Sequence, residues 1–345
     1  MAFNINHQYI DRFTGQVNNE ELFSDSCIRF IYSDIRERSP WIFNALTGVR
    51  MSQLLGFINY DSFLGQKVTG ADAIVRKIKF QSTEWVEPEN YYTTARKLFE
   101  RQIQYWTYRS MPETDHSIVS PADARMLVGS LKETSQWFVK GKFFDIDELL
   151  GQTKKNWIEL FRNGDIAIFR LTPDKYHYNH TPVAGTVIDF YEIDGPSHSC
   201  NPGAVIQMAQ PYSKNKRTVT IIDTDVEQGT GVGKVAMIEV TALMIGKIHQ
   251  CYSDDQYENP KNIYPGLFVR KGQPKSLYQP GSSVDILIFE SDRIHFDKDI
   301  VSNMFRQDVQ SRFSKGFGIP LVETDVRVRS QIGISATNKK EQYHE

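Results

Sequence analysis

Residues 278–289 read "YQPGSSVDILIF", a Pro-Gly-Ser-Ser turn followed by a mostly apolar run. The run from Val284 to Phe289 is rich in β-branched and large apolar side chains, which predicts a buried strand. Glycine permits the unusual backbone angles of a tight turn. We therefore expect a turn that leads directly into a strand of a β core. A serine hydroxyl beside a glycine carbonyl can also attack that carbonyl when a base removes its proton. Local features alone favour the structural role for Gly281-Ser282.

Similar runs recur along the chain from about residue 116 onward, separated by Gly, Pro, Asn and Asp. They include "DIAIFRL" (165–171), "GTVIDFYEI" (185–193), "RTVTIID" (217–223) and "KVAMIEVTALMIG" (234–246), which together predict a mostly antiparallel β core. Residues 20–66 carry apolar side chains at helical spacing, and "YTTARKLFERQIQYWTYRSM" (92–111) predicts a further helix ending near Pro112. We expect an α+β fold in which a helical N-terminal region, 1–112, packs on a β-rich core, 113–333. A polar tail, 334–345, follows.

Composition limits the classes of function. The chain has 345 residues, 24% of them charged, and a formal net charge of −2, typical of a soluble globular protein. Its basic residues are dispersed, so we do not expect nucleic-acid binding. Cys27, Cys200 and Cys251 are odd in number and widely spaced, which argues against a disulfide framework and favours a cytoplasmic setting. The sequence shows no signal-peptide pattern and no apolar run of about 18 residues, so we expect any membrane contact to be peripheral.

One glycine-rich motif has a structural explanation. "GTGVGKV", residues 229–235, resembles a phosphate-binding loop, but Gln228 and Val235 stand where that loop needs a glycine and a serine or threonine. A hairpin turn is the better interpretation.

Three further polar residues are candidates for chemistry. His177 and His180 lie in "TPDKYHYNHTPVAGTV" (172–187), where metal binding, a polar loop and acid–base catalysis all remain open. No nearby carboxylate or thiol has the spacing to complete a metal site. Asp123 lies in "VSPADARML" (119–127), either as a turn residue or as a carboxylate that orients a histidine.

The order of Asp123, the histidine pair and Gly281-Ser282 resembles the phosphatidylserine decarboxylase family. "YWTYRSM", "WFVKGKFFDIDELLG", "NPGAV", "KNKRTVTIIDT" and "IEVTALMIGKI" extend the resemblance over most of residues 20–333. The resemblance implies that the hydroxyl of Ser282 attacks the carbonyl of Gly281, with His180 removing the proton and Asp123 orienting His180. The chain then breaks between the two residues, and Ser282 becomes a covalent pyruvoyl cofactor.

The resemblance also implies the reaction. The pyruvoyl group would form a Schiff base with the amine of phosphatidylserine and accept the electron pair left by carbon dioxide, giving phosphatidylethanolamine. His177 is the nominated proton carrier for the product. No metal is implied, and a homodimer is expected.

The chain departs from the family pattern at three places. Ala124 follows Asp123 where glycine is usual, Tyr178 follows His177 where arginine is common, and Ser283 stands where threonine is frequent. The changes leave two alternatives: a pyruvoyl-dependent decarboxylase of a free amino acid such as tryptophan, and a non-catalytic scaffold. A scaffold needs none of the candidate site residues, so their joint presence argues against it. Apolar residues between Trp41 and Ile58 either lie in a membrane interface or pack on the β core.

Overall fold

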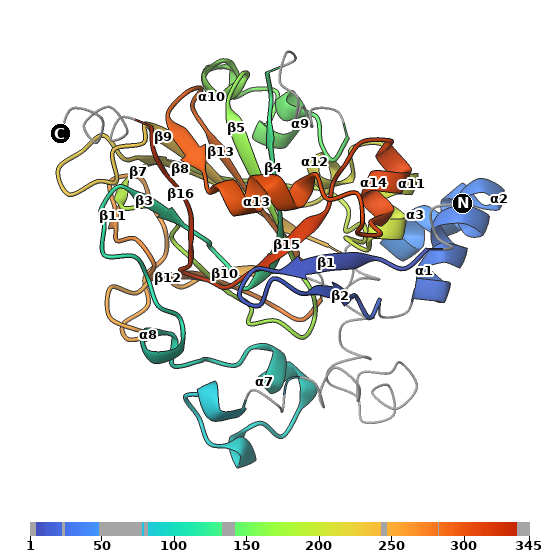
Figure 1. The fold of residues 1–345 in the computed structure, drawn as a ribbon, viewed down its shortest axis with the longest axis horizontal. Coiled ribbons are helices and arrows are strands. Elements are labelled where there is room, and N and C mark those ends of the chain that lie inside the picture. Colours follow the sequence, from blue (N-terminus) through green and yellow to red (C-terminus); the bar gives the residue numbers. More distant parts are fainter. Residues whose placement is uncertain are drawn as a thin grey trace.

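A mostly antiparallel sheet forms the centre of the protein (Figure 1). The computed structural model describes residues 5–22, 25–47, 78, 82–132, 142–242, 247–281 and 283–336. The described strands of this sheet follow the order β11-β7-β8-β9-β13-β5-β4-β15-β1-β2. Their bounds are β1 Gln8–Asp11, β2 Val17–Asn19, β4 Ala124–Ser130, β5 Asp165–Leu171, β7 Gly185–Ile193, β8 Arg217–Asp223, β9 Lys234–Thr241, β11 Phe268–Val269, β13 Ser283–Phe289 and β15 Glu323–Val326. Only β1 and β15 pair in parallel among these strands, which confirms the predicted α+β class.

Two smaller sheets accompany the main one. The first has the order β10-β12-β6, and the second has the order β14-β16-β3. Their bounds are β3 Ser117–Val119, β6 Tyr178–His180, β10 Ile248–Gln250, β12 Pro274–Tyr278, β14 Ile294–Phe296 and β16 Gln331–Ser335. The first of these sheets holds His180 and leads into the turn at Gly281.

Strand β13 lies in the interior of the large sheet. It pairs along its whole length with β5 on one side and β9 on the other. All seven of its residues are buried, as a strand with apolar residues on both faces requires. The predicted turn and buried strand at residues 278–289 are therefore confirmed in the described residues on either side of position 282.

The chain between β8 and β9 forms the predicted hairpin. These strands are antiparallel neighbours. Gly231 and Gly233 have φ angles of +72° and +76°, which residues with a side chain rarely adopt. The glycines of "GTGVGKV" therefore shape a turn.

The described helices are short and lie outside the sheets, and one of them, α13, packs on β4 and β15 (Figure 1). Their bounds are α1 Asp25–Phe30, α2 Arg36–Arg38, α3 Pro40–Thr47, α7 Ala95–Phe99, α8 Tyr105–Tyr108, α9 Ile146–Leu150, α10 Lys155–Phe161, α11 Pro202–Gln207, α12 Pro211–Lys214, α13 Lys298–Met304 and α14 Arg312–Phe317. A π-helical turn, Ile31–Ile35, joins α1 to α2, and short 3-10 turns occupy Ser82–Glu84 and Glu89–Tyr91. The helices expected within residues 25–47 are thus present.

The apolar residues of these first helices differ in burial. Phe43 is buried and its ring meets that of Tyr32 edge-on at a centroid distance of 5.2 Å, whereas Trp41 is 75% exposed. Part of the face therefore packs inward and part meets solvent. The candidates at 51–58 lie outside the described residues.

The single helix predicted over 92–111 is wrong. Two short helices, α7 and α8, flank an extended segment in which Ile103 pairs with Trp85 in a β-bridge. The backbone N–H of Ile103 donates to the hydroxyl of Tyr257, which donates in turn to the carbonyl of Ile103. These bonds replace those of a helix, because burial of Ile103 and its aromatic neighbours outweighs helical propensity.

The N-terminal strand is fixed by a buried ionic network. His7, Glu20 and Glu323 place ligand-type atoms within 4.8 Å of one another. Arg170 Nη2 lies 2.6 Å from a carboxylate oxygen of each glutamate, and Arg125 also contacts Glu20. Since arginines occupy these carboxylates, the cluster is an ion-pair network that holds β1 against β15.

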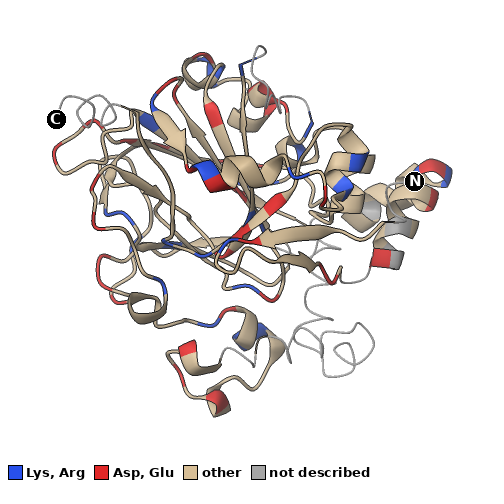
Figure 2. Cartoon of the chain, viewed as in Figure 1, with Lys and Arg blue, Asp and Glu red and all other residues tan. Residues whose placement is uncertain are grey.

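Charges of both signs are interspersed over the described chain (Figure 2). In the described part, the helices all fall short of the length and apolar character that crossing a bilayer requires.

Candidate active site

Asp123 lies just before β4 and is held by an arginine. Arg109 Nε and Nη2 donate to the two carboxylate oxygens at 3.1 and 2.8 Å, and the backbone N–H of Val328 donates at 2.8 Å. Arg109 also donates to Glu84 at 2.8 Å. Burial alone would raise the pKa of Asp123, but Arg109 lowers it to about 2. The carboxylate is therefore ionised at neutral pH.

The replacement of glycine by Ala124 causes no backbone strain. Ala124 is the first residue of β4, pairs with Val326 and has no positive φ. Its methyl group is fully buried. This departure from the family pattern leaves the geometry of Asp123 intact.

His180 ends β6 with a fully buried ring. Its Nδ1 lies 2.9 Å from the carbonyl oxygen of Gly272, and its Nε2 lies 3.0 Å from the hydroxyl of Tyr176. A carbonyl can only accept, so Nδ1 carries the proton and Nε2 presents its lone pair to Tyr176. Burial lowers the pKa of His180 to about 3. The ring is thus a neutral imidazole with Nε2 as its basic atom.

Asp123 and His180 are neighbours without a shared hydrogen bond. The backbone N–H of His180 donates to the carbonyl of Pro121 at 2.7 Å, which brings the ring close to the Asp123 loop. Gly272 and Tyr176 set the ring orientation in the described residues. The charge of Asp123 opposes the effect of burial on the pKa of His180. An orienting role for Asp123 stays a prediction, and the geometry gives it an electrostatic basis.

His177 precedes β6 and is also fully buried. Its ring stacks on Phe99 with a centroid distance of 3.6 Å and an interplanar angle of 14°. Neither ring nitrogen has a hydrogen-bond partner in the described chain. Burial and then the charge of Arg101 lower the pKa of His177 to about 3. The carbonyl of His177 accepts from the N–H of Tyr278 at 3.1 Å, which joins it to the end of β12.

Gly281 follows β12 at the turn into β13. It is buried and has φ +152°, an angle that favours glycine. Ser282 lies outside the described residues. On the far side, Ser283 is buried opposite Leu171 and Thr241, and its hydroxyl has no partner among the described residues. The turn therefore connects the strand beside both histidines to the interior of the main sheet.

A tyrosine spans this turn. The hydroxyl of Tyr278, in β12, lies 2.7 Å from Asp285 Oδ1 and 3.1 Å from the carbonyl of Val284, both in β13. Burial and the neighbouring Glu239 keep the pKa of Asp285 far above its ordinary value, so Asp285 is a neutral acid. Tyr278 thereby fixes the two strands relative to each other.

A cavity of about 550 Å³ reaches the site from the Asp123 side. Its lining includes Arg109, Asp123, Lys175, Asp325 and Arg327. Lys175 belongs to the loop that also carries His177, so the cavity borders this loop, although His177 itself does not line it.

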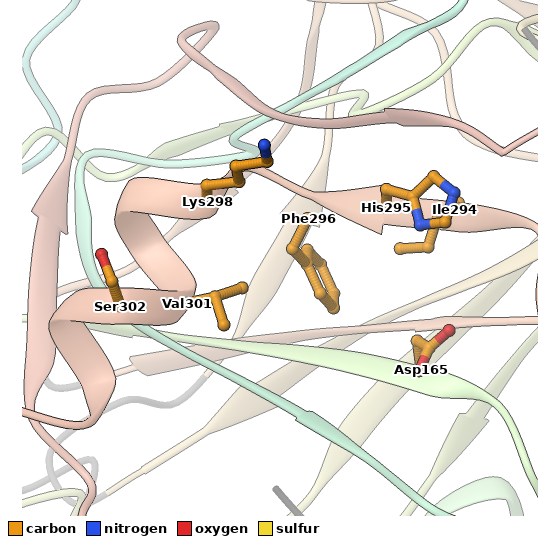
Figure 3. Close-up of a pocket in the computed structure, with 7 residues that line it drawn as sticks. All are labelled: Asp165, Ile294, His295, Phe296, Lys298, Val301 and Ser302. Carbon is orange, nitrogen blue, oxygen red and sulfur yellow. The ribbon is translucent and has the colours of Figure 1, made fainter. Parts of the chain in front are cut away.

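A second cavity of about 300 Å³ lies between α13 and β14 (Figure 3). Phe296 and Val301 line it with Asp165, whose pKa burial raises to about 6. It contains none of the predicted site residues.

Sequence reasoning missed several residues of the site. Arg109, Tyr176 and Gly272 hold Asp123 and His180, yet none follows a pattern that predicts this contact. The quoted "YWTYRSM" segment was the one available signal for Arg109.

Comparison with known proteins identifies the family of this chain. The sequence profile of the family described as phosphatidylserine decarboxylase matches residues 95–310. The chain belongs to this family of carboxy-lyases, and it is an enzyme. It is 27% identical over 316 residues to the phosphatidylserine decarboxylase proenzyme of Fusobacterium nucleatum, covering 90% of this chain and 95% of that protein. It is 30% identical over 303 residues to the phosphatidylserine decarboxylase proenzyme of Chlamydia trachomatis serovar D, covering 85% and 90%.

Proposed function

We propose that this protein is a self-processing decarboxylase that converts phosphatidylserine to phosphatidylethanolamine and carbon dioxide. One observation carries the proposal: two buried, neutral imidazoles flank the strand that leads into Gly281, with His180 opposite Pro274 at the start of β12 and His177 bonded through its carbonyl to Tyr278 at the end. The names of the relatives support the substrate, and the word proenzyme in those names supports processing of a precursor.

Self-processing would use only groups of the chain. The hydroxyl oxygen of Ser282 bonds to the carbonyl carbon of Gly281 while His180 takes the hydroxyl proton. The peptide C–N bond then breaks, the freed amine of residue 282 takes a proton, and an ester joins the two residues. Loss of the α-proton of residue 282 expels the Gly281 carboxylate and leaves dehydroalanine. Hydrolysis of dehydroalanine releases ammonia and leaves a pyruvoyl group.

Charges in the site support this order of events. A neutral His180 can accept a proton, and the ionised Asp123 stabilises the imidazolium that results. Because Tyr176 donates to Nε2 of His180, a proton can reach Nε2 through Tyr176, which takes up one proton as it gives its own.

The described side of the turn can accommodate a pyruvoyl group. The hydroxyl of Ser283 is a buried polar atom without a partner in the part of the chain that is described, so a hydrogen-bonding group is available directly after the proposed cut. When present, the group supplies an electron sink for the pair that remains after carbon dioxide leaves. His177 would then deliver the proton that completes the product.

The alternative substrate is a free amino acid. Tyr178, in place of the arginine common in the family, packs its ring against Tyr176 at 5.6 Å and Tyr257 at 5.1 Å. The loss of that cation favours a substrate without an anionic headgroup, unless another cation replaces it.

Membrane contact and dimerisation are further parts of the proposal. Trp41 and Phe30 are 75% and 56% exposed on the first helices, as a peripheral contact with lipid requires. The homodimer rests on the family resemblance alone.

Intact mass spectrometry of the purified protein tests the proposal. We expect a C-terminal fragment of residues 282–345 with a pyruvoyl-blocked N-terminus, and a full-length chain for Ser282→Ala. Release of carbon dioxide from phosphatidylserine vesicles, compared with free serine and tryptophan, identifies the substrate. A wild-type chain that stays intact would refute self-processing, and reaction with free amino acids alone would refute the lipid substrate.

A further inference from the structure

Arg101 is a buried arginine without an acidic partner. Its side chain lies between α7 and the loop before β6, and the residue is 1% exposed. Nη1 donates to the carbonyl of Leu98 at 3.1 Å and Nη2 to the carbonyl of Asp174 at 2.9 Å, while Nε has no partner. Across the described ranges, no carboxylate oxygen lies within ion-pair distance of this guanidinium. A buried charge held only by carbonyls is costly, so its presence calls for an anion that binds there.

The loop that this guanidinium contacts carries further groups with unused hydrogen-bonding capacity. Thr172 Oγ1 and both ring nitrogens of His177 have no partner in the described chain, and both residues are buried. The bond from Arg101 to the carbonyl of Asp174 ties the guanidinium to the loop that carries both. Phe99, at the end of α7, stacks on His177 from the same side of the chain. The buried Thr172 hydroxyl stands two residues before the carbonyl that Arg101 contacts, and a guanidinium N–H and a hydroxyl are donors that suit the oxygens of an anion.

Long-range charges do not neutralise this arginine. Burial is the largest influence on the pKa of Arg101 and lowers it to about 10. Asp123, Asp174 and Glu84 oppose that effect from a distance, and Arg109 adds to it. Asp123 is already bound by Arg109 in two hydrogen bonds. Arg101 thus remains charged at neutral pH and available to a ligand.

We infer that Arg101 and Thr172 bind the phosphate of the substrate headgroup, an assignment that rests on the proposed function. Decarboxylation converts a carboxylate into neutral carbon dioxide. A cation on that carboxylate would therefore stabilise the ground state more than the transition state. The phosphate keeps its charge throughout, so a contact with Arg101 positions the substrate without opposing the reaction. The cavity of about 550 Å³ opens beside the same loop, because Lys175, three residues after Thr172, lines it.

This site also accounts for Tyr178. The family pattern places a cation directly after the first histidine of the pair, and Tyr178 occupies that position here. Arg101 brings a guanidinium to His177 from a different segment, close enough to lower the pKa of His177. Arg101 would therefore supply the cation for an anionic headgroup, although it lies far along the chain from the histidine pair.

The site is tested by calorimetry on the purified, processed protein. The affinity for O-phosphoethanolamine is compared with that for ethanolamine, which lacks the phosphate. For wild type we expect O-phosphoethanolamine to bind at least tenfold more tightly than ethanolamine. Arg101→Gln should remove that difference, and Thr172→Val, which keeps the shape of the side chain, should reduce it several-fold. Arg96→Gln, on the same helix α7, is the matched control and should bind both compounds as wild type does.

Different outcomes would overturn the phosphate site and the proposed decarboxylase function. Intact mass spectrometry first establishes that each variant forms the 282–345 fragment. Tenfold or greater preference for O-phosphoethanolamine in both Arg101→Gln and Thr172→Val would overturn the phosphate site while leaving the decarboxylase function standing. If Arg101→Gln does not fold, the Thr172→Val and Arg101→Lys variants test the site instead. A phosphate site requires Thr172→Val to weaken the binding of O-phosphoethanolamine while leaving the binding of ethanolamine unchanged. An intact, inactive wild-type chain would instead overturn the proposed function.

Discussion

Replacing Arg109 by glutamine would leave the buried carboxylate of Asp123 without its cation. The pKa of Asp123 is about 2, against an ordinary value near 3.8, and nearly two pKa units correspond to about 2.5 kcal/mol. The pKa of Arg109 is raised despite burial because it binds Glu84 as well as Asp123. The Asp123 shift is therefore the better measure of this one pair. Loss of one partner of a buried pair costs about 3–5 kcal/mol. We expect Arg109→Gln to lower the free energy of unfolding by about 3 kcal/mol at pH 7.

Chemical denaturation in the Ser282→Ala background measures this cost on an uncut chain. A double-mutant cycle with Asp123→Asn isolates the pair, with an expected coupling of about 2 kcal/mol. Arg162→Gln, just after α10 and with a side chain 42% exposed, is the control and should change stability by less than about 0.5 kcal/mol. A coupling below about 0.5 kcal/mol would show that Arg109 does not hold the charge of Asp123.

Two further predictions concern the histidines and the turn. Folding lowers the pKa of His177 and His180 from 6.5 to about 3, so the unfolded chain binds more protons between these values and stability falls as the pH drops below 6.5. Each histidine should lower the free energy of unfolding by about 2 kcal/mol at pH 5. In denaturation experiments on the Ser282→Ala chain, adding His177→Phe should halve this pH-dependent loss of stability. A free energy of unfolding that does not change with pH would contradict the buried, neutral state of the histidines. Gly281→Ala should strain the turn by about 1–3 kcal/mol and slow fragment formation, followed by mass spectrometry. Gly266→Ala, at φ +98° in open space, should leave the rate unchanged, and equal rates for both variants would exclude a role for the Gly281 backbone.

The strands of the core could be predicted closely from the sequence. "DIAIFRL", "GTVIDFYEI" and "RTVTIID" coincide with β5, β7 and β8 residue for residue. Strand propensity and burial agree in these runs, so a local pattern was sufficient. The segment 92–111 failed because Ile103 obtains its hydrogen bonds from Tyr257, more than 150 positions away along the chain.

The candidate site was only partly predictable, for the same reason. The motifs identified Asp123, His177 and His180 through their chemistry and order. The groups that hold them, Arg109 and Gly272, come from distant segments and are identified by contacts rather than by spacing. Arg101 precedes the "YWTYRSM" segment without belonging to it, and only its burial without an acidic partner distinguishes it from an ordinary surface arginine.

The interior position of β13 has a consequence for the timing of processing. A cut before residue 282 would assign β13, β14, β15 and β16 to the smaller fragment, and β13 and β15 are inserted at two separate places in the main sheet. The turn at Gly281 therefore acquires its geometry only once β13 is in place between β5 and β9. The two resulting polypeptides would remain interleaved, so they could separate only by global unfolding. Reassembly after denaturation would then be bimolecular and would depend on protein concentration, whereas the uncut precursor would refold as a single chain.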